Sequence, residues 1–132
     1  MSRWLSLLLA LTAAQAVAHH SFAVFFDGDK TVAVTGKVTE FKFANPHGTI
    51  ALDVKGKSGK TEVWKAETNA PVILRRLGWT KDSLQLGETI TIEGWLARNG
   101  THYIRMRKVT RADGSTVGTP ISFDPKSDLN SK

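Results

Sequence analysis

The chain has 132 residues, a formal net charge of +6 and no cysteine. Its length is that of one domain, which can bury roughly two thirds of the surface that the unfolded chain exposes. The absence of cysteine excludes disulfides, thiolate metal sites, covalent CxxCH haem attachment and cysteine nucleophiles. In a cytoplasmic protein the positive charge would favour nucleic acid as a partner.

The first 18 residues have the pattern of a secretory signal peptide. Arg3 precedes an apolar run from Trp4 to Leu11. Ala16 and Ala18 then form the small-x-small pattern after which signal peptidase cuts. The apolar stretch is shorter than the roughly 20 residues that a bilayer requires. We therefore expect a periplasmic or secreted protein without a transmembrane segment, cleaved between Ala18 and His19, and we exclude nucleic acid as its partner.

Alternating apolar residues predict five strands and one helix. The first strand is expected over residues 31–43, with a bulge near residues 39–40 where the apolar positions change parity. The sequence Asn-Pro-His-Gly at residues 45–48 predicts a turn. A helix of about two turns follows the third strand, with Asn69 as N-cap and Gly78 just beyond its end. The remaining strands are expected at residues 50–54, 61–67, 89–97 and 101–111.

The order strand, strand, strand, helix, strand, strand is that of the OB-fold, a five-stranded barrel whose helix lies between the third and fourth strands. We predict an all-β protein with one short helix. An OB-fold-like barrel would occupy residues 19–118 after a signal peptide over residues 1–18. Residues 119–132 are polar and contain two prolines, which predicts a loosely attached tail.

Several stretches together resemble a known family. They are AHHSFAVFFD, TGKVTEFKFANPHGTI, ILRRLGWTKDSLQLGETITIEGW and RKVTRADGS. Over residues 18–118 the chain resembles DUF6152, a family of small exported bacterial proteins of unknown function. The AHHSF start, the NPH turn and the RxGW followed by LxxG are the most specific pieces. The resemblance implies a periplasmic or secreted single domain with no established activity.

The sharpest chemical feature is the histidine pair at the predicted mature start. His19 would offer a metal ion its free α-amine and its imidazole, and both groups lose their protons near neutral pH. One further imidazole would complete the T-shaped arrangement called a histidine brace. His47 is the best candidate, since it stands in a turn where Pro46 fixes its approach. These nitrogen ligands favour copper, so we predict a small exported copper-binding protein that uses His19, His20 and His47.

Other interpretations stay open. The histidines could be ordinary polar residues that bind no metal, and His102, beside a hairpin turn, is a weaker ligand candidate. The alternative function is a metal-free binding module for an anionic or carbohydrate-like partner, which would use one barrel face. The residues of that face are Trp95, Tyr103, Arg105 and Arg107. We expect no catalytic residues, although a histidine brace can support oxidative copper chemistry.

Overall fold

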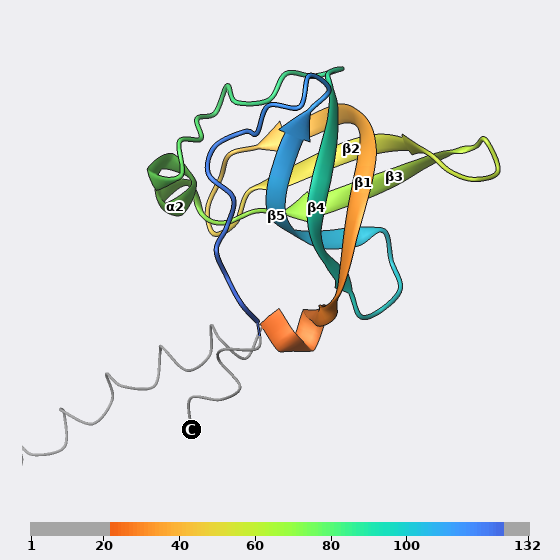
Figure 1. Cartoon of the computed structure of the whole chain (residues 1–132), viewed down its shortest axis with the longest axis horizontal. Helices are drawn as coiled ribbons and strands as arrows, with labels where there is room; N and C mark the ends of the chain where they lie inside the picture. Colours follow the sequence, from red (N-terminus) through yellow and green to blue (C-terminus); the bar gives the residue numbers. More distant parts are fainter. Residues whose placement is uncertain (1–21, 126–132) are drawn as a thin grey trace, which may run out of the picture.

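The computed structural model describes residues 22–125 (Figure 1). The predicted signal peptide, His19 and His20 lie outside these residues. A helical turn over residues 22–25 comes first. The elements after it are β1 (Phe26–Lys42), β2 (Thr49–Lys55), β3 (Thr61–Glu67), α2 (Pro71–Arg76), β4 (Thr89–Ala97) and β5 (Tyr103–Arg111). Within residues 22–125, no helix has the length and apolar character that crossing a membrane demands.

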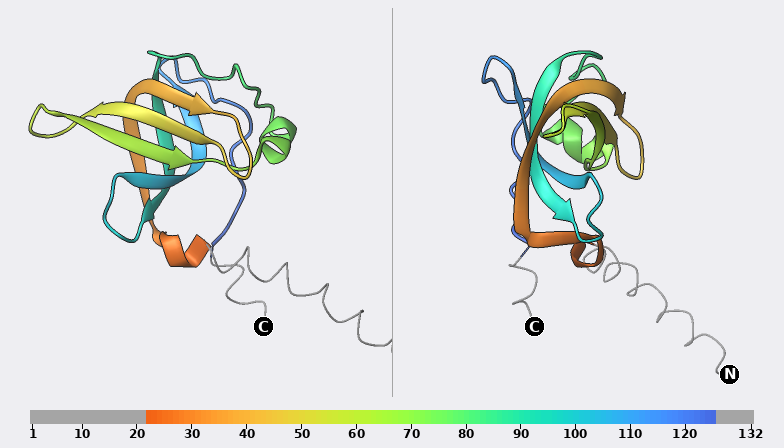
Figure 2. Two further views of the ribbon diagram at one scale, coloured as in Figure 1. Left: turned by 180° about the vertical axis from the view of Figure 1, so that it is seen from behind. Right: turned by 90° about the vertical axis from the view of Figure 1, so that its right-hand side faces the viewer.

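The five strands form a closed barrel in the order β1-β2-β3-β5-β4 (Figures 1 and 2). All neighbouring strands are antiparallel except β3 and β5, which run parallel and pair Lys65 with Tyr103 and Glu67 with Arg105. Helix α2 lies between β3 and β4 in the chain. The prediction of an OB-fold-like five-stranded barrel with one short helix in this position is therefore confirmed.

Strand β1 is long because it joins two sides of the barrel. Its first part pairs with β4 and its last part with β2. The register with β2 shifts between Val38 and Glu40, where the change of parity predicted a bulge. At Gly36 a Cβ atom would lie 2.5 Å from the carbonyl oxygen of Asp53. A side chain at this position would push the two strands apart.

The barrel interior is filled by aliphatic side chains, and each fully buried one contributes about 2 kcal/mol to stability. Leu74 of α2 and Trp79 close one end and are 0% and 2% exposed. A second, smaller apolar cluster lies outside the barrel on β4. It contains Phe26, Trp95 and Ala97, with Phe22, Tyr103 and Phe123 packed against them.

Two local predictions need correction. The N-cap of α2 is Ala70, with no side-chain cap, because the side chain of Asn69 accepts a hydrogen bond from Arg105 instead. The predicted loose tail begins as part of the domain. The backbone N–H of Thr119 donates to Leu77 O at 2.7 Å, and the Phe123 ring packs on Trp95 at a centroid distance of 5.7 Å. Gly78 follows the helix end with φ +87°, as its position predicted.

Candidate metal centre at the first strand corner

A cluster of polar side chains surrounds the carboxylate of Glu67 at the end of β3. The Arg105 guanidinium donates from Nη1 to Oε1 at 2.9 Å, and the Tyr103 hydroxyl donates to Oε2 at 2.9 Å. Nδ1 of His47 lies 3.0 Å from Oε1. We call these four residues the Glu67 cluster. It joins the corner between β1 and β2 to strands β3 and β5.

Strand register brings the cluster together. In the β2–β3 hairpin Thr49 pairs with Glu67, so the corner just before Thr49 lies beside this carboxylate. The backbone N–H of Thr68 donates to Gly48 O at 2.9 Å and ties the corner to the end of β3. The parallel pairing of β3 with β5 sets Arg105 opposite Glu67.

Arg105 is the most firmly held member of the cluster. Its side chain is 17% exposed, and it also donates to Thr68 O at 2.7 Å and to the Asn69 side chain. Burial lowers the pKa of Arg105, and the adjacent Glu67 carboxylate opposes this change. Burial, followed by the hydrogen bond to Glu67, raises the pKa of Tyr103 to about 12. Tyr103 is therefore neutral at neutral pH and acts as a hydrogen-bond donor.

The His47 ring is the exposed edge of the cluster. Half of its side chain surface is open to solvent. Nδ1 faces Glu67, and no residue among 22–125 pairs with Nε2 through a hydrogen bond or ion pair. The ring therefore has one nitrogen set against a fixed carboxylate and a second nitrogen available to a ligand.

The first described residues are docked on the same barrel by aromatic contacts. The ring centroid of Phe22 lies 5.6 Å from that of Phe26, 5.4 Å from Trp95 and 5.2 Å from Phe123. Phe26 in turn stacks on Tyr103 at 5.7 Å. A short series of side-chain contacts thus leads from Phe22 to the Glu67 cluster.

Backbone contacts fix this segment further. Nε of Arg98 donates to Ala23 O at 2.8 Å, and the Arg98 N–H donates to Phe25 O at 2.9 Å. Figure 1 shows the helical turn at one end of the barrel, with the last described residues of the chain beside it. The first described residues are therefore fixed to the barrel by both side-chain and backbone contacts.

The cluster alone does not make a metal site. Among residues 22–125, no three side chains of the His, Cys, Asp or Glu type come together. A metal ion at the corner would need ligands from outside this range. His19 and His20, the two other predicted ligands, lie there.

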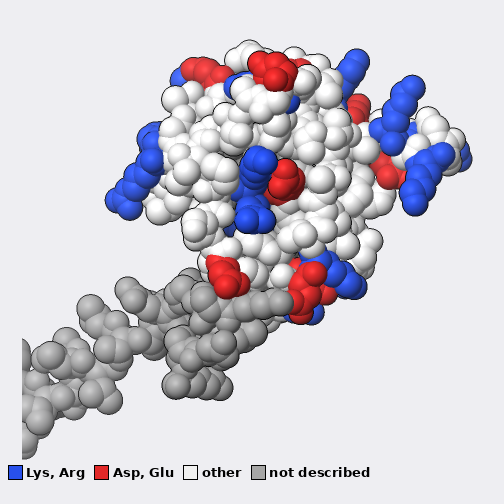
Figure 3. All heavy atoms as spheres, in the orientation of Figure 1, with Lys and Arg blue, Asp and Glu red and all other residues white. Residues whose placement is uncertain are grey.

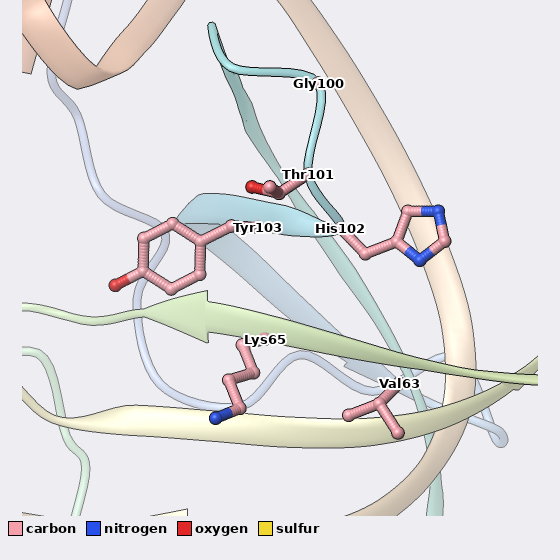
Figure 4. Close-up of a pocket in the computed structure, with 6 residues that line it drawn as sticks. All are labelled: Val63, Lys65, Gly100, Thr101, His102 and Tyr103. Carbon is pink, nitrogen blue, oxygen red and sulfur yellow. The ribbon is translucent and has the colours of Figure 1, made fainter.

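His102 belongs to another part of the surface. Its Nε2 lies 3.8 Å from Oε2 of Glu62, and its ring stacks on Trp64 at 4.5 Å with an interplanar angle of 8°. The structure pairs His47 and His102 with different glutamates. His102 also lines an open cavity of about 610 Å³ beside β3 and the β4–β5 turn (Figure 4).

The four residues of the predicted alternative face do not form a common open surface. Trp95 faces outward from β4, but Phe22 and Phe123 cover it and leave it 4% exposed. The Tyr103 hydroxyl and the Arg105 guanidinium are hydrogen-bonded to Glu67. Only Arg107 of this set is exposed.

Glu67 is the functional residue that sequence reasoning missed as a partner of His47. The signal was present, because a hairpin closed by residues 55–61 sets residue 49 opposite residue 67. Extending that register by two residues places His47 near Glu67.

The barrel topology and the helix position define an OB-fold-like protein. The comparison with protein families gives the particular family. Residues 7–105 match the model described as "Family of unknown function (DUF6152)", and the chain belongs to this family. No curated protein sequence matches the chain.

Several solved structures are similar to the chain. The mitochondrial single-stranded DNA-binding protein Rim1 of S. cerevisiae matches with a TM-score of 0.47 and 10% identity, covering 68% of this chain and 95% of Rim1. A small single-stranded DNA-binding protein from Streptomyces coelicolor matches with a TM-score of 0.43 and 17% identity, over 62% of this chain and 91% of that one. The N-terminal domain of PriB from Thermoanaerobacter tencongensis matches with a TM-score of 0.42 and 19% identity, covering 64% of this chain and 97% of that domain.

The exclusion of nucleic acid that we made from the sequence is wrong. It rested on the predicted export of the chain. Two of these matching barrels are single-stranded DNA-binding proteins. The fold itself therefore gives no ground for the exclusion, and nucleic acid belongs in any test of partners.

Proposed function

We propose that the protein is an exported binding protein that holds Cu(II) through His19, His20 and His47. His19 would chelate the ion through its α-amine and ring. The observation that carries this proposal is the contact of His47 Nδ1 with Glu67 Oε1 at 3.0 Å. Metal-binding histidines usually set their second ring nitrogen against a carboxylate in this way.

The surroundings of Glu67 support the proposal. A carboxylate behind a metal-binding histidine fixes the ring orientation and tautomer and makes the ligand more basic. It does so best when it cannot rotate, and Arg105 and Tyr103 each hold one oxygen of Glu67 at 2.9 Å. Nε2 of His47 is then the nitrogen that would bind the ion.

The docking of Phe22 supports the participation of the chain start. His19 stands three residues before Phe22 in the sequence. An extended chain covers about 3.3–3.6 Å per residue, so the Cα atom of His19 lies within about 11 Å of that of Phe22. Phe22 is itself connected to Tyr103 of the cluster through Phe26. The short stretch of chain between His19 and Phe22 favours a site formed jointly by the predicted mature start and the corner that contains His47.

The choice of copper follows from the donor set. Amine and imidazole nitrogens suit Cu(II), Ni(II) and Zn(II), and the affinity order favours Cu(II). A thioether site for Cu(I) is not supported, because Met106 is the only methionine after the predicted cleavage point and is 1% exposed. We propose binding and not catalysis.

Copper titration against a competing chelator tests the proposal. The protein should be prepared with His19 as its first residue, verified by mass spectrometry, and compared with a chain that carries three additional glycines before His19. A single added glycine would place His20 third in the chain and create the amino-terminal Cu(II)/Ni(II) motif. We expect one tightly bound Cu(II) per chain and a loss of affinity of at least about a hundredfold in the extended chain, because its α-amine is displaced. Equal affinity of the two chains would falsify a brace at His19.

A further inference from the structure

Strand β3 has a complete partner on one side and a partial partner on the other. All seven of its residues pair with β2, whereas only Lys65, Ala66 and Glu67 pair with β5. The hairpin formed by β2 and β3 projects beyond the barrel (Figures 1 and 2). Within residues 22–125, no strand pairs with this edge of β3 from Thr61 to Trp64.

The backbone groups at this edge point away from β2. The N–H of Lys65 donates across the edge to His102 O at 3.0 Å. The N–H and C=O of one residue in a strand face the same neighbour, and every second residue repeats this direction. Thr61 and Val63 therefore turn their N–H and C=O groups to the open edge. Together they offer two donors and two acceptors in line with the existing ladder.

An open cavity of about 610 Å³ lies along this edge (Figure 4). Figure 4 shows Val63 and Lys65 on β3, with Thr101 and His102 on the opposite side. Val63 is 56% exposed, although it is apolar. The cavity can receive side chains of a strand that lies against β3.

Charge indicates the chemistry of such a strand. Residues 55–65 contain four lysines and a single carboxylate, Glu62. The lysines are exposed, and Figure 3 shows basic side chains gathered at the tip of the projecting hairpin. Oε2 of Glu62 lies 3.8 Å from Nε2 of His102, so this carboxylate already has a neighbour on the barrel. An acidic segment would therefore be attracted to this edge.

We infer that the open edge of β3 binds an extended acidic segment of a partner protein by strand addition. Backbone hydrogen bonds to Thr61 and Val63 would give affinity, and Lys65 would select acidic side chains. Lysines on an exposed edge can also serve only to prevent strand pairing. The two roles differ in whether a peptide binds. This site is independent of the proposed copper site.

The probe is a synthetic peptide of alternating glutamate and valine, six residues long, with its lysine-valine counterpart as control. NMR spectra of the labelled protein should show slowed amide exchange at Thr61 and Val63 when the acidic peptide is added. Val63→Pro removes the edge N–H, which faces away from β2, so the hairpin keeps its ladder. Val63→Thr keeps the N–H and is the matched variant, and melting curves check that both fold.

The inference requires that the acidic peptide binds the wild type and Val63→Thr but not Val63→Pro. Lys65→Glu should weaken this binding about fivefold, as expected for one lost exposed ion pair, and improve binding of the lysine peptide. Absence of binding at about millimolar peptide, or equal binding to Val63→Pro, would overturn it. Protection of the same amides by oligothymidylate or by self-association, without a response to the acidic peptide, would overturn it as well.

Discussion

Two histidine–glutamate pairs on this barrel differ in their surroundings. Nδ1 of His47 lies 3.0 Å from Oε1 of Glu67, and Nε2 of His102 lies 3.8 Å from Oε2 of Glu62. Their imidazoles are similarly exposed, at 50% and 45%. Glu67 is held by two further donors, whereas His102 is stacked on the ring of Trp64.

The difference is the reason that the proposed copper site includes His47 and not His102. A firmly held carboxylate sets the direction of the imidazole and leaves its other nitrogen for a ligand. A stacked imidazole, by contrast, contributes packing to the sheet surface. Exposure alone does not separate the two residues. The two residues differ in the hydrogen bonds that hold the neighbouring carboxylate, since Tyr103 and Arg105 both donate to Glu67.

The largest expected effect is on copper affinity when a histidine is removed. His47→Ala should lower Cu(II) affinity by at least about a hundredfold, since the loss of a ligand exceeds the loss of its supporting contacts. His102→Ala should leave the affinity unchanged. Competition titrations of both variants, each starting at His19, measure this difference, and an equal loss in both would remove the distinction between the pairs.

The next largest effect is on copper affinity when a glutamate is replaced. Glu67→Gln should weaken Cu(II) binding about 10- to 100-fold, because the amide holds the His47 ring less firmly. Glu62→Gln serves as the matched control and should bind as the wild type does. Circular dichroism confirms that both variants fold. Unchanged affinity in Glu67→Gln would mean that Glu67 does not orient the ligand.

The third prediction concerns proton binding by Tyr103, the only tyrosine of the chain. Its pKa is raised from 10.0 to about 12. The stability that this residue contributes is therefore fully present below pH 10 and is lost as the pH rises to about 12. Ultraviolet titration of the folded protein should give an ionisation near pH 12. In Glu67→Gln the pKa of Tyr103 should fall toward 10 but stay above it, because burial remains the largest cause. Ionisation of Tyr103 at the ordinary pKa in the wild type would contradict the cluster geometry.

The smallest effect is on stability at the second pair. His102→Ala should lower the free energy of unfolding by about 1 kcal/mol through the lost stack on Trp64. His47→Ala should change it less, since its ring has no aromatic neighbour among the ring contacts of residues 22–125. Urea denaturation measures both values. A larger loss in His47→Ala would show that the first pair is mainly structural.

Most of the fold followed from local patterns. Alternating apolar residues gave the bounds of β3 and β4 correctly, and the change of parity in β1 located its bulge. These features depend on neighbours within one strand or across one turn. The strand order then followed from the position of the helix between the third and fourth strands.

The site was predicted less completely, because its contacts join distant parts of the chain. The turn containing His47 was recognised, but its partner Glu67 depends on the register of the next hairpin. Trp95 was correctly placed on the outer side of β4. Its cover comes from Phe22 and Phe123, near opposite ends of the chain, and no local pattern indicates that contact.

The most direct test is the paramagnetic effect of copper on the histidine rings. One equivalent of Cu(II) should be added to the protein that begins with His19 while the ring proton signals are recorded by NMR. A site at the corner predicts that the His47 signals broaden beyond detection and the His102 signals remain. Persistent His47 signals, or equal broadening of both rings, would contradict the account.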